Sequence, residues 1–210
     1  MKNKSLINWL CLSGILSVIF YILHDIIGAM NYPQYDWLSQ AVSDLTAKDA
    51  PSFVIASGYV SIYGIFNCLC CALVSVLVKN ENNKILKIGV YIFSIMNFIS
   101  AIGYSLFPLS SAGFDGSIQT IIHVYIITTL VVLLSIISLI LIAIGSLNGK
   151  EKHKCLGYLA ILSLFLMFVG AVGSGSVPKE YFGLIERFST YSAVVFTGIL
   201  GLYGFCVFKE

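Results

Sequence analysis

Six long apolar segments constrain the fold of this chain more than any other feature of its sequence. They cover about residues 7–30, 53–78, 85–107, 118–146, 156–172 and 184–208. A helix needs around 20 apolar residues to cross a hydrocarbon core of about 30 Å. We therefore expect an all-α integral membrane protein, a bundle of six transmembrane helices that forms one domain over residues 1–210.

The composition agrees with a membrane protein and excludes other classes. Hydrophobic residues make up 58% of the chain and charged residues only 10%, whereas about 25% of the residues of a soluble domain are charged. The net charge of +2 is small and the lysines lie in short connecting segments, so the sequence excludes nucleic-acid binding. The apolar run after MKNKS is long and no A-x-A-like cleavage site follows it, which favours an uncleaved first span.

The distribution of basic residues predicts the orientation in the membrane. On one side lie nine lysines: Lys2, Lys4, Lys79, Lys84, Lys87, Lys150, Lys152, Lys154 and Lys209. The other side has only Lys48, Lys179 and Arg187. Cytoplasmic loops carry the excess of basic residues. We expect a multi-pass protein of the cell membrane with both termini in the cytoplasm, and an outer end that is rich in carboxylates.

The six cysteines favour packing over chemistry. They are Cys11, Cys68, Cys70, Cys71, Cys155 and Cys206. None falls in an outer loop, so no disulfide is expected. Cys68, Cys70 and Cys71 lie in an apolar segment without a histidine, which is typical of small packing residues rather than of a metal site.

The segment YDWLSQAVSDL, from Tyr35 to Leu45, is a polar stretch between the first two apolar segments. Read as a helix, it has one polar face, made of Asp36, Ser39, Gln40, Ser43 and Asp44, and one apolar face. It is too short and too charged to cross a bilayer. We therefore predict a short amphipathic helix that lies across the outer end of the bundle.

Ionisable groups in apolar spans are costly and need a partner or water, so their positions are the main functional signal. At the outer end, Asp115, Gln119 and His123 recur at a spacing of four, as on one helical stripe. The predicted ligand-binding pocket consists of His24, Asp25, Asp36, Ser39, Ser43, Asp44, Asp115, Gln119, His123, Glu186 and Arg187.

Several chemical readings of this pocket remain open. His24, Asp25, Asp115 and His123 are candidate ligands of a divalent metal such as zinc, although no two histidines occupy metal-binding positions on one helix. His24 and His123 could instead ligate a haem, or form hydrogen bonds between spans. Ser39 and Ser43 lie outside any G-x-S-x-G motif, so serine catalysis is not favoured.

Arg187 is the one arginine of the chain. Its planar guanidinium suits a carboxylate or a phosphate better than a lysine would. We predict that it pairs with a carboxylate outside its own helix, from the set Asp25, Asp36, Asp44 and Asp115. The alternative is an interfacial side chain that reaches lipid phosphates.

Several motifs together resemble a known family of membrane proteins. The first span ends with His24 and Asp25, and YDWLSQAVSDLTA follows with a proline soon after. LFP stands at Leu106 to Pro108, His123 follows early in the fourth span, and GLIER at Gly183 to Arg187 opens the sixth. The chain thus resembles, over nearly its whole length, the family catalogued as domain of unknown function 998. The resemblance implies a six-helix fold and no known activity.

The leading functional hypothesis is an outward-facing polar pocket that binds a lipid headgroup or a small polar ligand, as in a transporter or receptor. One alternative is a membrane-embedded, metal-dependent hydrolase. The second alternative is a haem-binding membrane protein.

Overall fold

The computed structural model describes residues 4–149 and 151–208, and this part of the chain forms helices and turns without any strand. Lys2, Lys150, Lys209 and Glu210 lie outside the described residues. Six helical segments are long and apolar enough to cross a membrane, so the predicted fold class is confirmed. These segments are Leu6–Met30, Phe53–Val78, Lys84–Leu106, Ile118–Leu147, Lys154–Gly173 and Lys179–Cys206.

Several spans contain more than one helical element. The first consists of α1 (Leu6–Leu10) and α2 (Ser13–Met30). The second and third are α3 (Phe53–Val78) and α4 (Lys84–Leu106). The fourth begins with α5 (Ile118–Ile121), continues as the π-helical turn η2 (Ile122–Ile127) and ends as α6 (Thr128–Leu147).

A short 3-10 turn precedes the main helix of each of the last two spans. In the fifth, η3 (Glu151–His153) leads into α7 (Lys154–Gly173). In the sixth, η4 (Lys179–Tyr181) leads into α8 (Phe182–Cys206). The helices α3, α4, α7 and α8 begin and end within two residues of the corresponding apolar segments in the sequence.

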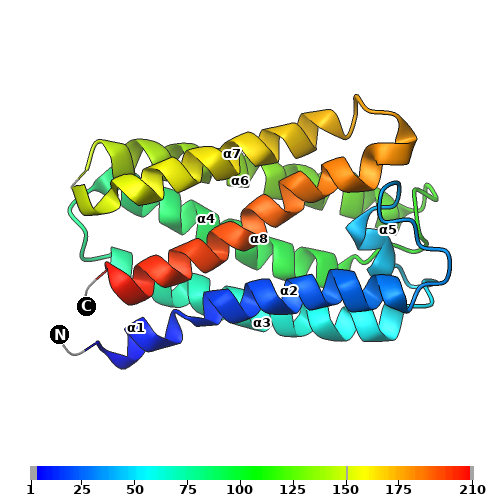
Figure 1. Cartoon of the computed structure of the whole chain (residues 1–210), viewed down its shortest axis with the longest axis horizontal. Helices are drawn as coiled ribbons and strands as arrows, with labels where there is room; N and C mark the ends of the chain where they lie inside the picture. Colours follow the sequence, from blue (N-terminus) through cyan, green and yellow to red (C-terminus); the bar gives the residue numbers. More distant parts are fainter. Residues whose placement is uncertain (1–3, 150, 209–210) are drawn as a thin grey trace.

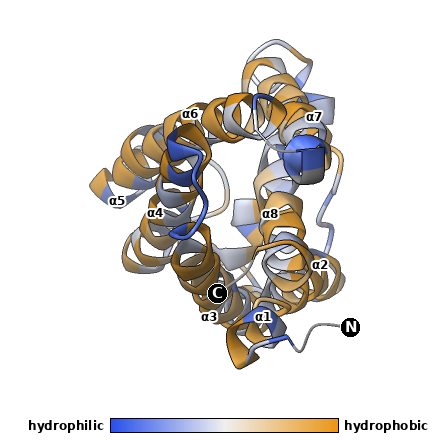
Figure 2. Cartoon of the chain, turned by 90° about the vertical axis from the view of Figure 1, so that its left-hand side faces the viewer, coloured by the Kyte–Doolittle hydropathy of each residue, from blue (hydrophilic) through white to orange (hydrophobic). Residues whose placement is uncertain are grey.

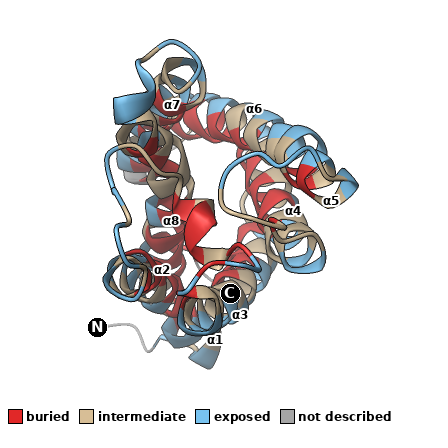
Figure 3. Ribbon diagram, turned by 90° about the vertical axis from the view of Figure 1, so that its right-hand side faces the viewer, coloured by how far each residue is buried: buried red, intermediate tan, exposed pale blue. Residues whose placement is uncertain are grey.

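The six spans are arranged as a ring (Figures 1 and 2). Going around the ring, α2 contacts α3, which contacts α4, and α4 contacts α6. From there α6 contacts α7, α7 contacts α8, and α8 closes the ring against α2. α8 also contacts α3. Buried residues face the middle of the ring and exposed ones face outward (Figure 3). Because many of the exposed residues are large and apolar, for example Ile95, Leu133 and Phe165, the outward faces suit lipid.

Small residues let the helix backbones approach closely where α8 passes its neighbours. A Cβ on Gly201 of α8 would overlap the carbonyl oxygen of Cys11. A Cβ on Gly170 of α7 would overlap the backbone of Ser189 in α8. The path of α8 between its two neighbours is therefore set by contacts that no larger residue permits.

The connecting segments gather at the two ends of the ring. The acidic end carries segments 31–52, 107–117 and 174–181, and the basic end carries segments 79–83, 148–149 and 151–153 together with both ends of the described chain (Figure 1). Most ionisable residues of the predicted pocket belong to the acidic end, where the first long loop (residues 31–52) covers the ends of α2 and α8.

Candidate functional site

Arg187, in the first turns of α8, forms a buried ion pair with Asp25 of α2. Its Nε donates to Asp25 Oδ2 at 2.9 Å and its Nη2 to Asp25 Oδ1 at 2.8 Å. The two residues are only 3% and 1% exposed. Two parallel bonds of this kind give both strength and a fixed orientation. The prediction that Arg187 pairs with a carboxylate of another helix is confirmed.

The remaining donors of Arg187 hold the first long loop. Its Nη1 donates to the carbonyl oxygens of Trp37 at 3.0 Å and Gln40 at 3.1 Å, and to that of Gly183 at 2.9 Å. Its Nη2 donates to the hydroxyl of Tyr35 at 2.7 Å. The guanidinium is thus saturated by the protein, and it ties α2, α8 and the loop together.

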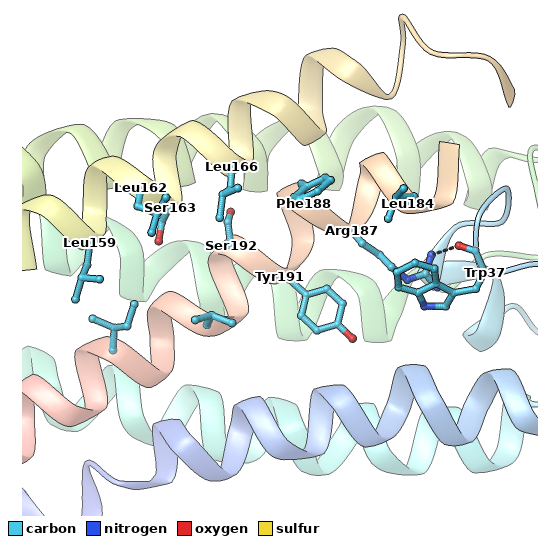
Figure 4. Close-up of a pocket in the computed structure, with 12 residues that line it drawn as sticks. Trp37, Leu159, Leu162, Ser163, Leu166, Leu184, Arg187, Phe188, Tyr191 and Ser192 are labelled. Carbon is cyan, nitrogen blue, oxygen red and sulfur yellow. Dashed lines mark hydrogen bonds between the residues drawn. The ribbon is translucent and has the colours of Figure 1, made fainter. Parts of the chain in front are cut away.

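Aromatic side chains complete the shell of the ion pair. The hydroxyl of Tyr191, one turn after Arg187, donates to Asp25 Oδ2 at 2.8 Å, and the indole N–H of Trp37 donates to the same oxygen at 3.3 Å. The guanidinium carbon of Arg187 lies 4.5 Å from the centre of the Trp37 ring. Figure 4 shows this ring over the arginine. Trp37 therefore covers the ion pair on one side.

The segment Tyr35–Leu45 is not the amphipathic helix that its polar and apolar pattern predicts. It consists of turns, followed by the 3-10 turn η1 (Val42–Thr46). Arg187 takes the carbonyl groups of Trp37 and Gln40, which an α-helix would use internally. The side chain of Asp36 accepts the amide N–H of Leu38 at 3.1 Å, which further stabilises a turn.

Asp44 and Glu186 accept hydrogen bonds from two successive amides of this loop. Ala41 N–H donates to Asp44 Oδ2 at 3.1 Å, and Val42 N–H donates to Glu186 Oε2 at 3.0 Å. Asp44 Oδ1 also accepts the N–H of Gly113 at 2.9 Å. Burial raises the pKa of the Asp44 carboxyl above its usual value. Burial likewise raises the pKa of Tyr35, whose hydroxyl lies against Arg187.

His123 is buried inside the π-helical turn η2. Its Nδ1 lies 2.7 Å from the carbonyl oxygen of Phe107, which follows the last residue of α4. The ring of Tyr104 is 4.7 Å away, and the Tyr104 hydroxyl is 3.0 Å from Thr128 Oγ1. Such π-helical turns are frequent at functional sites.

His24 of α2 is also buried. It is 2% exposed, and neither of its ring nitrogens has a hydrogen-bond partner among the described residues. Its ring lies 5.3 Å from that of Tyr21. The hydrogen bond between spans that was one reading of His24 is not present in this structure.

Other predicted pocket residues lie at the surface of the acidic end. The hydroxyl of Ser39 donates a hydrogen bond to the Asp36 carboxylate and lowers the pKa of that group. Asp115 precedes α5 instead of continuing its helical stripe, and the amide N–H of Ser117 lowers its pKa.

Ser43 and Gln119 are half-buried near these loops. The backbone carbonyl of Ser43 accepts a hydrogen bond from the hydroxyl of Thr46. Gln119 Oε1 accepts a bond from Lys48 at 3.2 Å. Neither residue joins the shell of the ion pair.

The four candidate metal ligands are not brought together. Within the described residues, no group of three or more His, Cys, Asp and Glu side chains could hold a metal ion. Asp25 already accepts hydrogen bonds from Arg187, and Nδ1 of His123 is hydrogen-bonded to a backbone carbonyl. No geometry among the described residues favours the metal-dependent hydrolase or the haem protein.

A groove with a volume of about 410 Å³ runs between α7 and α8 toward the acidic end (Figure 4). Trp37, Arg187 and Tyr191 border it at that end. Its walls are lined mostly by apolar side chains: Leu159, Leu162, Leu166, Leu184, Phe188, Val195 and Ile199, with Ser163 and Ser192 between them. Phe188 and Val195 are about two-fifths exposed, at 38% and 42%, so the groove opens on the outward face of the ring.

The sequence patterns missed the aromatic residues of the site. Tyr35, Trp37 and Tyr191 contact the ion pair directly. The spacing of Arg187 and Tyr191, four residues apart on one helix, is the signal that could have identified Tyr191. Trp37 and Tyr35 depend on the path of the loop, which has no periodic pattern.

The comparisons with known proteins give one match. A family model described as a protein of unknown function (DUF998) matches residues 15–203. No curated protein and no solved structure matches the chain.

Proposed function

The chain belongs to the DUF998 family of proteins of unknown function, and we propose that it binds a membrane lipid. One acyl chain of the lipid lies in the groove between α7 and α8. The polar end of the lipid lies beside the first long loop, at the acidic end of the bundle. The protein then acts as a lipid-binding or lipid-transporting component of the membrane.

The shape and lining of the groove support this proposal. Its wall on α8 extends from Leu184 to Ile199, which is about 22 Å of helix at 1.5 Å per residue. A hydrocarbon core is about 30 Å thick, so a chain in the groove reaches past the middle of the bilayer. The lining is apolar, as sites for apolar ligands generally are.

The acidic end of the groove supports a lipid that is recognised chiefly through its chain. Trp37 borders the groove there and is 42% exposed. Tryptophan is favoured at the level of lipid headgroups, because its ring is apolar and its N–H is polar. The five N–H groups of Arg187 already face six acceptor atoms of the protein. Arg187 therefore has no donor left for a lipid phosphate.

The single observation that carries the proposal is the open apolar groove of about 410 Å³ against Trp37 and Arg187. Native mass spectrometry of the purified protein tests it. We expect bound lipid on the wild type, and a several-fold loss in Val195→Phe, which narrows the groove. The matched control is Ile137→Phe on α6, because Ile137 is 46% exposed on another outward face. Equal retention of lipid by the wild type and both variants would contradict the proposal.

A second measurement reports on the occupant in a bilayer. The chain has two tryptophans, Trp9 and Trp37, so Trp9→Phe leaves Trp37 as the one fluorophore of its kind beside the groove. Phosphatidylcholine with brominated chains should quench this fluorescence. The Val195→Phe change should reduce the quenching, whereas Ile137→Phe should leave it unchanged.

The same proposal includes the location and orientation of the protein. The lysine-rich segments support a cell-membrane protein whose termini and basic end are cytoplasmic. Asn82→Cys and Ser176→Cys place thiols in loops at opposite ends of the bundle. In intact cells, a membrane-impermeant maleimide should label the thiol at position 176 and spare the thiol at position 82. The opposite labelling would reverse the orientation.

A further inference from the structure

A second cavity, with a volume of about 350 Å³, lies at the basic end of the ring. Its lining comes from the loop between α3 and α4 and from the segment between α6 and α7: Glu81, Asn82, Asn83, Asn148, Gly149 and His153. Figure 2 looks onto this end, where the connecting segments are hydrophilic and the helices behind them are largely apolar. The cavity shares no lining residue with the groove between α7 and α8.

The lining of this cavity forms hydrogen bonds on every side. Among the described residues that border it, none has an apolar side chain. Sites for small molecules are usually lined by apolar groups with a few polar ones between them. Here three amides, a carboxylate and an imidazole surround the space instead, and an amide side chain both donates and accepts hydrogen bonds. A ligand that fits this lining is therefore polar all round.

Two of the lining groups are buried and hold each other in place. Nε2 of His153 lies 3.2 Å from Oε2 of Glu81, and their side chains are only 2% and 11% exposed. The imidazole ring of His153 also lies 5.7 Å from the ring of Phe208, which follows α8. The contact between His153 and Glu81 joins the two connecting segments, so this wall of the cavity is preformed.

Asn83 fixes another wall of the cavity. Its side-chain oxygen accepts the N–H of Leu86 at 3.0 Å and caps α4, and its Nδ2 donates to the carbonyl oxygen of Gly145 in α6 at 2.7 Å. Asn82 and Asn148, in contrast, are exposed lining residues. The cavity thus has rigid walls and two exposed amides that can meet a ligand from outside.

The loop between α3 and α4 carries an excess of positive charge. Residues 79–87 contain three lysines and one glutamate. Within the part of the chain that the structure describes, Lys79, Lys84 and Lys87 form no ion pair. Lys87 Nζ lies 3.4 Å from the carbonyl oxygen of Lys79, so its ammonium stays beside this loop. These lysines attract an anion to the rim of the cavity.

The carboxylate and the lysines set opposite requirements for a ligand. An ionised carboxylate only accepts hydrogen bonds, so the part of a ligand that meets Glu81 must donate N–H or O–H groups. A negative group placed against Glu81 would be repelled, whereas beside the lysines it would be stabilised. A ligand with hydroxyl groups at one end and a negative charge at the other satisfies both parts of the site.

We propose that this cavity binds a small phosphorylated polyol. Its hydroxyl groups meet Glu81 and the asparagine amides, and its phosphate lies toward the rim that the lysines flank. The volume of about 350 Å³ is within the range of roughly 300–1,000 Å³ that is typical of small-molecule sites. Basic pockets between spans also hold lipid headgroups, so a free solute and a lipid with a polyol headgroup offer the same chemistry.

This site and the proposed lipid groove are independent. They lie at opposite ends of α7, and the cavity needs no lipid chain in the groove. Loss of lipid from Val195→Phe would leave this inference untouched, and absence of glycerol phosphate binding would leave the lipid proposal untouched.

The test uses the full-length protein in nanodiscs of phosphatidylcholine, whose headgroup has no hydroxyl. Radiolabelled glycerol phosphate is the probe, and bound label is measured at constant ionic strength. We expect saturable binding. Inorganic phosphate or glycerol alone should displace the label only at concentrations about tenfold higher than unlabelled glycerol phosphate, because each has one half of the ligand. No saturable binding, or equally effective displacement by inorganic phosphate, would overturn the proposal.

Asparagine variants assign the binding to the cavity. Asn82→Ala and Asn148→Ala should each weaken glycerol phosphate binding roughly fivefold, since each removes an amide that meets the ligand. Both residues are exposed, so the truncations should leave the fold intact. The matched control is Asn80→Ala, an exposed asparagine of the same loop that does not line the cavity. Equal binding by all three variants would overturn the site.

Two lysine variants test the position of the phosphate. Lys84→Gln removes a positive charge beside the cavity, and the control Lys48→Gln removes one from the acidic end; both lysines are exposed. We expect several-fold weaker binding in Lys84→Gln alone. Equal effects of the two changes would show attraction by the net charge of the protein and would overturn the placement of the phosphate.

Nanodiscs that contain phosphatidylglycerol distinguish the source of the ligand. Phosphatidylserine is the control, because it has the same net charge and lacks a polyol. If phosphatidylglycerol alone competes with free glycerol phosphate, the site takes a lipid headgroup. If the two lipids act alike, the ligand comes from solution. Both results support the site when Asn148→Ala weakens the binding, and unchanged binding in that variant would overturn it.

Discussion

Asp25 and Arg187 lie 162 residues apart in the sequence, and their side chains meet through two parallel hydrogen bonds of 2.9 and 2.8 Å. The pair is almost fully buried, because Trp37 covers it and Tyr191 donates a hydrogen bond to Asp25. The acidic end of the bundle is therefore organised around one buried contact between the first and the last span.

Loss of either partner should destabilise the fold. Breaking a buried ion pair by removing one side chain costs about 3–5 kcal/mol. We expect Arg187→Ala to lower the melting temperature strongly. Arg187→Lys should lower it less, since lysine keeps the charge but cannot make the two-pronged contact. Thermal unfolding in nanodiscs measures both effects.

A double-mutant cycle tests whether the two residues act as a pair. Asp25→Asn combined with Arg187→Ala should destabilise less than the sum of the single changes, because the double variant leaves no unpaired charge. Strictly additive effects would show that Arg187 stabilises the fold through the loop carbonyl groups alone.

Gly183→Ala should also destabilise the acidic end. A Cβ at this position would overlap the carbonyl oxygen of Gln40, and overpacking of this kind costs about 1–3 kcal/mol. The matched control is Gly58→Ala in α3, where a Cβ meets no atom within 4 Å. Alanine is the better helix former, so this control should be neutral or stabilising by up to about 1 kcal/mol. Equal melting temperatures of the two variants would contradict the close packing of the loop on α8.

Asp44 should make the stability depend on pH. Burial raises the pKa of its carboxyl above the value of about 3.9 in an unfolded chain, so the folded state holds the proton more tightly. The resulting stability is present below about pH 3.9 and is lost as the pH rises through the raised pKa. From pH 4 upward, the melting temperature of the wild type should therefore fall relative to that of Asp44→Asn.

Asp36 provides a control of opposite sign for the pH experiment. The hydroxyl of Ser39 lowers the pKa of this exposed carboxyl. Its contribution is present above about pH 3.9 and is lost as the pH falls through the lowered pKa. Asp36→Asn should therefore differ from the wild type most above pH 4, by a constant amount, and converge with it in acid. Identical pH profiles for the Asp44 and Asp36 variants would contradict the burial of Asp44.

The spans could be predicted from the sequence because the length of an apolar run reflects the thickness of the membrane. The predicted second span, 53–78, coincides with α3 (Phe53–Val78). The π-helical turn around His123 could not be predicted, since its one wider turn leaves no mark on an apolar pattern. The helix predicted over Tyr35–Leu45 was wrong because Arg187, which lies far along the chain, takes the carbonyl groups of that loop.

The candidate site was predictable in composition but not in arrangement. An arginine among carboxylates predicts an ion pair, and the pair exists. The choice of Asp25 among four carboxylates depends on the packing of α8 against α2, which one sequence does not reveal. For the same reason the patterns could not show that Asp115 remains exposed while Asp44 is buried.

The separation of 162 residues between Asp25 and Arg187 also has a consequence for biosynthesis. At a typical 5–20 residues per second, Arg187 is synthesised roughly 8 to 32 seconds after Asp25. During that time the first span holds a carboxyl group without its partner, at a cost of about 2.5–3.5 kcal/mol on insertion scales if the group is ionised in the bilayer. The donors of Arg187 that hold the first long loop are absent until the sixth span is made, so the acidic end cannot be completed before that span enters the membrane.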